Sequence, residues 1–124
     1  MQLQVITREA IRILHHLHKH QDEKHTKQSI TEAVGIPSSR FARIILKLRS
    51  KGLISSSGTR QSNSYMLGRP MSEISFYDVV LAIEGENYNT HCAKHEHCKI
   101  HDFLQVMRSS MIETMQSKSI VDLV

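Results

Sequence analysis

Tryptophan is absent from this chain, and aromatic residues make up only 5% of it. No apolar run approaches the roughly 20 residues that a membrane-spanning helix needs. A membrane-surface helix would carry Trp or Phe opposite its cations, and the basic residues here do not follow that pattern. No signal peptide is recognisable in the sequence. We therefore expect a cytoplasmic protein with no membrane partner.

Cysteine is also scarce, because Cys92 and Cys98 are the only two in the chain. In the reducing cytoplasm, these thiols are not expected to form a permanent structural disulfide. The sequence also lacks a nucleophile and base in a recognisable catalytic pattern. We therefore expect a binding protein and not an enzyme.

Charge is unevenly distributed along the 124 residues, whose apolar content of 40% is enough for one modest core. Up to Pro70 there are twelve Lys or Arg and four Asp or Glu, a net charge of +8, whereas the rest carries −4. A basic N-terminal part suits a polyanion such as DNA, and an acidic C-terminal part is expected to face protein or solvent. We expect one structural domain, with a DNA-binding part over 1–70 and a helical sensor and dimerisation arm over 71–124.

The segment that follows His25 has the pattern of a short helix and a turn. Thr26 can act as the N-cap, and Gly35 permits the left-handed backbone that ends such a helix. Pro37 cannot continue the helix, and Ser38 or Ser39 can cap the next one. The apolar positions of the short helix are Ile30, Ala33 and Val34.

A second helix is expected to follow the turn and to end at Gly52. Arg40, Arg43 and Lys47 lie along one side of it, at i, i+3 and i+7. Cationic donors near the N-terminus of the second helix are what reading of a DNA major groove requires. The apolar side comprises Phe41, Ile44, Ile45 and Leu48.

Two short strands, 53–57 and 64–67, follow as a hairpin with a polar tip, which is typical of a wing. Arg60 at the tip can enter a minor groove, where narrow geometry concentrates negative potential. Alternatively, Arg60 contacts only phosphate, which positions the protein without specifying a base sequence.

These features also have a purely structural explanation, because a basic helix face can serve solubility and two helices can simply pack together. The agreement between turn residues, basic stripe and hairpin favours binding to a double-stranded DNA operator. The predicted DNA-binding residues are Thr26, Gln28, Ser38, Ser39, Arg40, Arg43, Lys47 and Arg60.

Three further helices complete the expected fold, which is mainly α with a small β-hairpin wing. Thr7 can cap the first, and Ser75 with Asp78 forms a capping box for another that ends at Gly85. The last helix is expected from Ile100 to Met115 and to mediate homodimerisation, with packing inside one chain as the alternative. A dimer would read a pseudo-palindromic operator. The apolar stripe of this last helix comprises Ile100, Phe103, Leu104, Met107, Met111 and Met115.

A run of histidines follows the first helix, and it is expected to lie solvated at the helix end, with metal binding as the lesser alternative. Its members are His15, His16, His18, His20 and His25.

A second group of Cys and His residues lies between the last two helices. Thiolate and imidazole are ligands for zinc, ferrous iron and iron–sulfur clusters. Cys98 and His101 are three residues apart at a helix start, so both can point to one side, and the helix N-terminus favours the thiolate of Cys98. The sequence leaves open a metal or cluster site, a reversible thiol switch or an inert loop. The candidate ligands are His91, Cys92, His95, His97, Cys98 and His101.

The chain resembles the Rrf2 family of bacterial transcription regulators, whose members include regulators of iron–sulfur assembly, nitric-oxide sensing and cysteine metabolism. No single motif carries this resemblance, which depends on the order and spacing of several segments. These segments are Met1-Gln2-Leu3, the Ile30 to Ile36 turn, Leu46 to Leu53, Tyr65 to Pro70, Ile74 to Gly85, the Cys region and Ile120 to Val124.

The resemblance implies a homodimer of winged helix-turn-helix units with a long, crossing C-terminal dimerisation helix. It also implies binding to an operator upstream of target genes, usually as a repressor. Carried over by position, the base-reading residues fall near Ser39, Arg40, Ala42 and Arg43, with Arg60 in the wing.

The sequence departs from the family pattern in two places. The family wing usually reads Arg-Gly-Pro-Gly-Gly-Gly before a Tyr, whereas the segment 58–64 here reads Gly-Thr-Arg-Gln-Ser-Asn-Ser. Members that bind a cluster usually supply three cysteines, and the first is absent here, while Cys92 and Cys98 match the other two. A [2Fe-2S] cluster completed by His91, His95, His97 or Glu9 of the partner subunit is one expectation. Zinc, a cluster-free thiol switch, a small-molecule effector and a metal-binding or protein-interaction module on a winged-helix scaffold are the alternatives.

Overall fold

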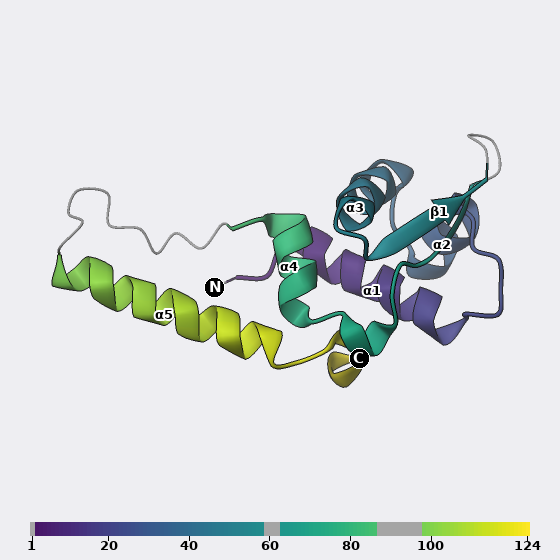
Figure 1. Ribbon diagram of the computed structural model, residues 1–124. Coiled ribbons are helices and arrows are strands. Elements are labelled where there is room, and N and C mark those ends of the chain that lie inside the picture. Colours follow the sequence, from purple (N-terminus) through teal and green to yellow (C-terminus); the bar gives the residue numbers. More distant parts are fainter. Residues whose placement is uncertain (1, 59–62, 87–97) are drawn as a thin grey trace.

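The computed structural model describes residues 2–58, 63–86 and 98–124. Five α-helices, two short 3-10 helices and a two-stranded hairpin make up the described part of the chain (Figure 1), which confirms the mainly helical fold with a wing. The elements in chain order are α1 (Val5–Lys19), α2 (Lys27–Val34), α3 (Ser38–Ser50), β1 (Ile54–Ser57), β2 (Ser64–Leu67), η1 (Met71–Glu73), α4 (Phe76–Glu84), α5 (Lys99–Gln116) and η2 (Ile120–Leu123).

The helix α1 lies at the centre of the fold and packs against α2, α3 and α4. Its apolar residues recur at helical spacing, so one side of it enters the core while the other stays in water. Burial of these side chains and of their partners is the main favourable term in folding. The buried residues that α1, α2 and α3 contribute are Ala10, Ile13, Leu14, Leu17, Ile30, Val34, Phe41, Ile44, Ile45 and Leu48.

The helix α2 begins and ends as the sequence predicts. The Thr26 side chain accepts a hydrogen bond from the backbone N–H of Ser29 at 3.2 Å, and the Ser29 hydroxyl oxygen accepts one from the backbone N–H of Thr26 at 2.9 Å. Gly35 ends α2 with φ of +74°, a conformation that side chains with a Cβ rarely adopt. The first helix of the motif is thus fixed at both ends.

The wing is an antiparallel hairpin in which Ile54 pairs with Leu67 and Ser57 pairs with Ser64. The backbone N–H of Tyr65 donates to the carbonyl of His25 at 2.8 Å, which ties β2 to the connection between α1 and α2. The Tyr65 ring also meets the edge of the Phe41 ring with centroids 5.5 Å apart. The wing is therefore positioned by contacts to both sides of the helix-turn-helix.

Gly68, just after β2, packs directly against backbone, and a Cβ at this position would clash with the carbonyl group of Gly52. We expect Gly68→Ala to lower the free energy of unfolding by on the order of 2 kcal/mol, because backbone cannot move aside as a flexible side chain would. Urea denaturation measures the loss. Gly35→Ala is the comparison, since it meets nothing within 4 Å and carries only the conformational cost of its positive φ. An unchanged midpoint for Gly68→Ala would contradict this packing.

The C-terminal segment returns to the same core. The helix α4 begins at the predicted capping box, in which the Ser75 hydroxyl accepts from the Asp78 N–H at 3.0 Å. The N–H of Ile120 donates to the carbonyl of Ile74 at 2.8 Å, and the Ile120 side chain is fully buried. The hydrophobic core therefore includes residues from both sides of Pro70.

Two predicted helix caps are wrong. Thr7 does not cap α1, which begins after Gln4; instead, the Thr7 side chain is buried and donates to the Glu84 carboxylate of α4 at 2.6 Å. Neither Ser38 nor Ser39 caps α3, because both lie inside its first turn and Pro37 occupies the N-cap position. Proline has the required φ and lacks an N–H, so it fits just before a helix without a side-chain cap.

The long helix α5 extends away from the body of the fold (Figure 1). It packs against α4, and Met115 near its C-terminal end is the one buried residue of this helix. None of the helices in the described part of the chain has the length and apolarity that a bilayer crossing requires. Large apolar side chains on the N-terminal half of α5 stay exposed, namely Ile100, Phe103, Val106 and Met107.

Candidate nucleic-acid interface

The second helix of the helix-turn-helix, α3, has one side in the core and the opposite side in solvent. The buried side consists of the four apolar residues predicted from the sequence. The opposite side is polar except for Ala42 and Leu46, of which Leu46 is 62% exposed. We call this solvent-facing side the outer face of α3; its residues are Ser39, Ala42, Arg43, Leu46 and Ser50.

Arg43 stands on the outer face without a partner among the described residues. The guanidinium group presents five N–H donors in a planar arrangement, which matches a guanine edge or a phosphate. Because no protein acceptor engages Arg43 in residues 2–58, 63–86 and 98–124, its donors are available to an external ligand. It is the predicted recognition-helix cation whose placement best suits DNA.

Arg40 lies to one side of the outer face and is engaged by α1. Its Nε and Nη2 atoms both donate to Oε2 of Glu9, at 3.1 and 2.9 Å. The Arg40 side chain is 48% exposed, whereas that of Glu9 is 7% exposed. Arg40 therefore neutralises a buried carboxylate, and this ion pair joins the start of α3 to α1.

Lys47 lies on the same side as Arg40 and is also engaged inside the protein. Its Nζ donates to the backbone carbonyl of Ile83 at 2.9 Å, near the C-terminal end of α4, where the helix dipole favours a positive charge. On the other edge of α3, Arg49 donates to the Ser56 hydroxyl of β1 at 3.0 Å. The cations flanking the outer face thus hold α3 against its neighbours.

The remaining predicted DNA-binding residues in the described part of the chain lie at the starts of α2 and α3. Thr26 is the N-cap of α2, and Gln28 on its exposed side donates to Glu32 at 3.2 Å. Ser38 and Ser39 are exposed in the first turn of α3. Helix N-termini carry unpaired N–H groups that suit phosphate, so these positions fit backbone contacts to DNA. Arg60 lies outside the described residues.

The predicted metal ligands divide into two groups. His91, Cys92, His95 and His97 all lie outside the described residues. Cys98 is the N-cap residue of α5, and His101 follows in its first turn, both half-buried. No set of three or more His, Cys, Asp or Glu side chains within 2–58, 63–86 and 98–124 is arranged to hold a metal ion.

The model of the Rrf2 family, described as an iron-dependent transcriptional regulator, matches residues 3–124. The chain belongs to the Rrf2 family. Its members are transcriptional regulators that bind DNA and not enzymes, so this Rrf2 protein is a DNA-binding transcriptional regulator. The resemblance identified from the sequence is therefore confirmed, and the outer face of α3 gains a functional context.

Solved structures show the same fold. CymR (YrzC), the global cysteine regulator of B. subtilis, is 18% identical, with a TM-score of 0.76 over 99% of this chain and 95% of that one. IscR of T. potens is 20% identical, with a TM-score of 0.74 over 99% of this chain and 85% of that one. The oxidized form of Staphylococcus aureus CymR is 21% identical, with a TM-score of 0.69 over 97% and 93%. No curated protein sequence matches the chain.

Glu9 of this Rrf2 protein has an unusual environment. One carboxylate oxygen, Oε2, accepts both bonds from Arg40, while the other, Oε1, is buried with no hydrogen-bond partner among the described residues. A buried carboxylate oxygen without a donor is costly, so such an atom indicates strain or a ligand that completes it. Glu9, one of the candidate ligands named from the sequence, therefore has one buried oxygen that no described residue engages.

The sequence predicts that the histidine run lies in solvent, but the structure packs part of it into the fold. The His16 ring lies against the rings of His20 and His25, with centroids 4.8 and 5.1 Å apart. His25 is buried, and its Nε2 donates to the His20 carbonyl at 2.7 Å. Its backbone carbonyl accepts from Tyr65 of β2, so the wing covers it. We call His16, His20 and His25 the histidine cluster; burial and then the charges of His25 and His20 lower the pKa of His16.

The histidine cluster predicts a pH dependence of stability. Because the folded state disfavours a charged His16, the unfolded chain binds more protons, and the free energy of unfolding should fall as pH drops below about 6.5. Glu23, which faces His20 at 3.7 Å, opposes this effect, and His15 adds to it. Urea denaturation at pH 7.5 and 5.5 should show a smaller loss for His16→Gln than for the unmodified protein. Equal losses would contradict the role of His16.

Sequence reasoning missed some candidate interface residues. Leu46 lies on the outer face of α3 and Arg49 lies at its edge, but neither belongs to the basic stripe that the sequence predicts. The signal was present, because the direction opposite to the four buried residues defines the outer face once the helix is drawn as a wheel.

Proposed function

We propose that this protein binds a pseudo-palindromic operator as a homodimer and represses transcription until a signal acts on the segment that contains Cys92 and Cys98. The observation that carries the proposal is the outer face of α3, on which Arg43 has no protein partner among the described residues. A second helix of a helix-turn-helix whose solvent-facing side carries an unpaired cation in its second turn suits the major groove.

DNA contacts divide into base reading and positioning in this proposal. Arg43 reads a base edge, with Ser39 and Ala42 beside it on the outer face. Thr26, Gln28 and Ser38 at the helix N-termini contact phosphate, and Arg60 of the wing enters the minor groove or contacts phosphate. Arg40 and Lys47 act from inside the protein, because Glu9 and Ile83 already engage them.

The exposed apolar stripe of α5 supports the homodimer. Ile100, Phe103 and Val106 are each more than 60% exposed, and Met107 is 44% exposed. A stripe at helical spacing that one chain leaves in water is suited to pack against a second copy of the same helix. The C-terminal part of α5 packs on its own chain through the buried Met115. One helix can therefore combine packing inside the chain at its C-terminal end with dimerisation along its N-terminal half.

We expect Phe103→Glu to weaken the dimer by at least about tenfold, because a charge would enter the apolar stripe. Sedimentation velocity across a dilution series measures the effect. Glu113→Gln, on an exposed part of the same helix, is the control and should leave the dimer unchanged. A Phe103→Glu protein that remains dimeric at every concentration would contradict the role of the stripe.

The signal is proposed to act through soft ligands near the start of α5. Cys98 precedes the helix, whose N–H groups favour a thiolate, and His101 follows one turn later. Thiolate and imidazole fit zinc or a [2Fe-2S] cluster, which supplies a redox-active iron centre when bound. The buried, unpartnered oxygen of Glu9 is a further acceptor that a cation could complete.

The alternative is a regulator with no cluster, in which Cys92 and Cys98 form a thiol switch or a small molecule is the effector. The presence of only two cysteines favours this alternative, because cluster-binding relatives usually supply three. The absorption spectrum and the iron, sulfide and zinc content of protein purified without oxygen distinguish the possibilities. Iron with sulfide supports a cluster, zinc alone supports a zinc site, and neither supports the alternative.

DNA binding is tested with a promoter fragment from the neighbourhood of its own gene in mobility-shift assays at increasing salt. Sequence-specific binding that weakens with salt supports the proposed function, because neutralised phosphates release counterions. No salt-sensitive binding to any such fragment would instead favour a metal-binding or protein-interaction module on a winged-helix scaffold.

A further inference from the structure

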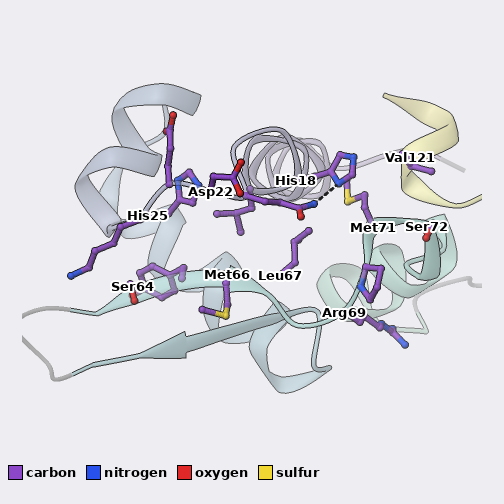
Figure 2. A pocket seen from close by; sticks show the side chains of 16 residues that line it. His18, Asp22, His25, Ser64, Met66, Leu67, Arg69, Met71, Ser72 and Val121 are labelled. Atoms are coloured by element: carbon purple, nitrogen blue, oxygen red, sulfur yellow. Dashed lines mark hydrogen bonds between the residues drawn. The ribbon is translucent and has the colours of Figure 1, made fainter.

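A pocket lies on the opposite side of β2 from β1, between the end of α1, β2 and the two 3-10 helices (Figure 2). Its volume is about 680 Å³, within the range of about 300–1,000 Å³ that small-molecule sites occupy. It contains none of the predicted DNA-binding residues and none of the ligands predicted around Cys92 and Cys98. The pocket is therefore a candidate site separate from both.

The lining of the pocket is mostly apolar. Leu17 of α1 and Met71 of η1 are almost fully buried and form its floor with Leu67 of β2, and Val121 of η2 contributes from the C-terminal segment. Apolar surface of this kind favours a ligand with a compact hydrocarbon or aromatic body. The elements that meet here come from the N-terminal, central and C-terminal parts of the chain.

The polar groups of the pocket indicate the charge of its ligand. Asp22 lies on the pocket side of the α1–α2 connection (Figure 2) and makes no hydrogen bond or ion pair with other described residues. Glu23 and Lys24 also line the pocket, and the second lining cation, Arg69, points away in the same view and pairs with Asp78 at 3.3 Å. The C-terminus of α1 also adds negative potential. Because Asp78 already pairs with Arg69, the carboxylates of Asp22 and Glu23 face only one remaining cation of the lining, Lys24, and this balance favours a positive group on the ligand.

Gln21 and His18 complete the polar side. The Gln21 side-chain amide donates to Nδ1 of His18 at 3.1 Å, which leaves the other nitrogen of that imidazole for a ligand. His18 belongs to the last turn of α1, and Gln21 directly precedes Asp22 in the connection that follows. The site thus combines apolar surface with an excess of carboxylate over unpaired cation and with a pair of hydrogen-bonding side chains.

We propose that this pocket binds a small organic cation with an apolar body and that its occupation changes the affinity for DNA through the wing. The regulatory part rests on the proposed function. The wing strand β2 lines the pocket, and the Tyr65 N–H bond to His25 ties the same strand to the helix-turn-helix. A ligand that binds one arrangement of these elements better than another shifts their equilibrium and hence the affinity for an operator.

Three probes with one body test the site: 2-phenylethylamine, its neutral analogue 2-phenylethanol and the anion phenylacetate. Titrations followed by amide chemical shifts should place the amine among residues 17–25 and 64–72. Its binding should be about threefold to fivefold tighter than that of the alcohol, since Asp22 is exposed to solvent. Asp22→Asn should remove this preference, and Glu113→Gln, which makes the same charge change on α5, should retain it. Equal binding of the three probes, or shifts elsewhere, would overturn the proposed site.

The effect on DNA is measured separately, as the affinity for the promoter fragment with and without the amine. A change of at least about twofold that Asp22→Asn abolishes supports regulation through the wing. An unchanged DNA affinity at saturating amine would overturn the regulatory part. Amine binding is measured without DNA, so a protein that binds the amine but no promoter DNA would contradict the proposed function and not the site.

Discussion

Replacing Arg43 with alanine should lower the affinity for the cognate operator by about tenfold to a hundredfold, which corresponds to about 1–3 kcal/mol for a bidentate base contact. The reason is that Arg43 stands on the outer face of α3 and makes no bond to other described residues. Its removal should leave the free energy of unfolding within about 0.5 kcal/mol, as for other exposed positions without partners. Quantitative mobility shifts and urea denaturation measure the two effects.

Lys47→Ala is the matched comparison, because the same helix loses a cation whose partner is inside the protein. We expect a loss of stability of about 1 kcal/mol from the broken bond to the Ile83 carbonyl. Any loss of DNA affinity should then be similar for cognate and unrelated fragments. If Arg43→Ala kept the preference for the cognate fragment, Arg43 would not be a base-reading residue.

The helix-turn-helix could be predicted from the sequence because its signals are local. The cap at Thr26, the glycine at 35 and the apolar spacing of α3 each act within a few residues, and the structure confirms all three. The capping box of α4 and a last helix from Ile100 to Met115, observed as Lys99–Gln116, could be predicted for the same reason. Local chemistry fixes where such elements begin and end.

The roles of the cations on α3 could not be predicted from spacing alone. With about 100° per residue, Arg43 lies about 150° from the centre of the buried side, whereas Arg40 and Lys47 lie about 90–110° from it. The flanking positions can reach neighbouring helices, and whether they do depends on where α1 and α4 lie. Glu9 is 31 residues from Arg40 in the sequence, so no local pattern indicates their contact.

The same reason accounts for the errors at Thr7 and His25. Thr7 has the residue type of a helix cap, but it is buried against α4 and bonds to Glu84, which is 77 residues away. His25 belongs to a polar run, but its backbone pairs with Tyr65 of the wing, and the side chain is thereby enclosed. In both cases, a distant segment determines the environment of a residue whose neighbours in sequence are uninformative.

The ion pair between Arg40 and Glu9 leads to the second large prediction. Arg40→Ala would leave both carboxylate oxygens of a nearly buried Glu9 without partners, since Oε1 already has none. We expect the free energy of unfolding to fall by about 3 kcal/mol, at the lower end of the cost of breaking a buried pair because Arg40 is half exposed. Urea denaturation of the single variant measures this loss.

The double variant Arg40→Ala with Glu9→Gln separates stability from DNA reading. Removing the buried charge should recover more than about 1 kcal/mol relative to Arg40→Ala, because a neutral amide costs less to bury than an unpaired carboxylate. If Arg40 positions α3 through Glu9, the stabilised double variant should retain its preference for the cognate operator. Loss of that preference in a stable, folded protein would instead show that Arg40 reads bases and that Glu9 only holds it in the unbound state. The Arg43→Ala protein, stable but without the preference, is the reference for that outcome.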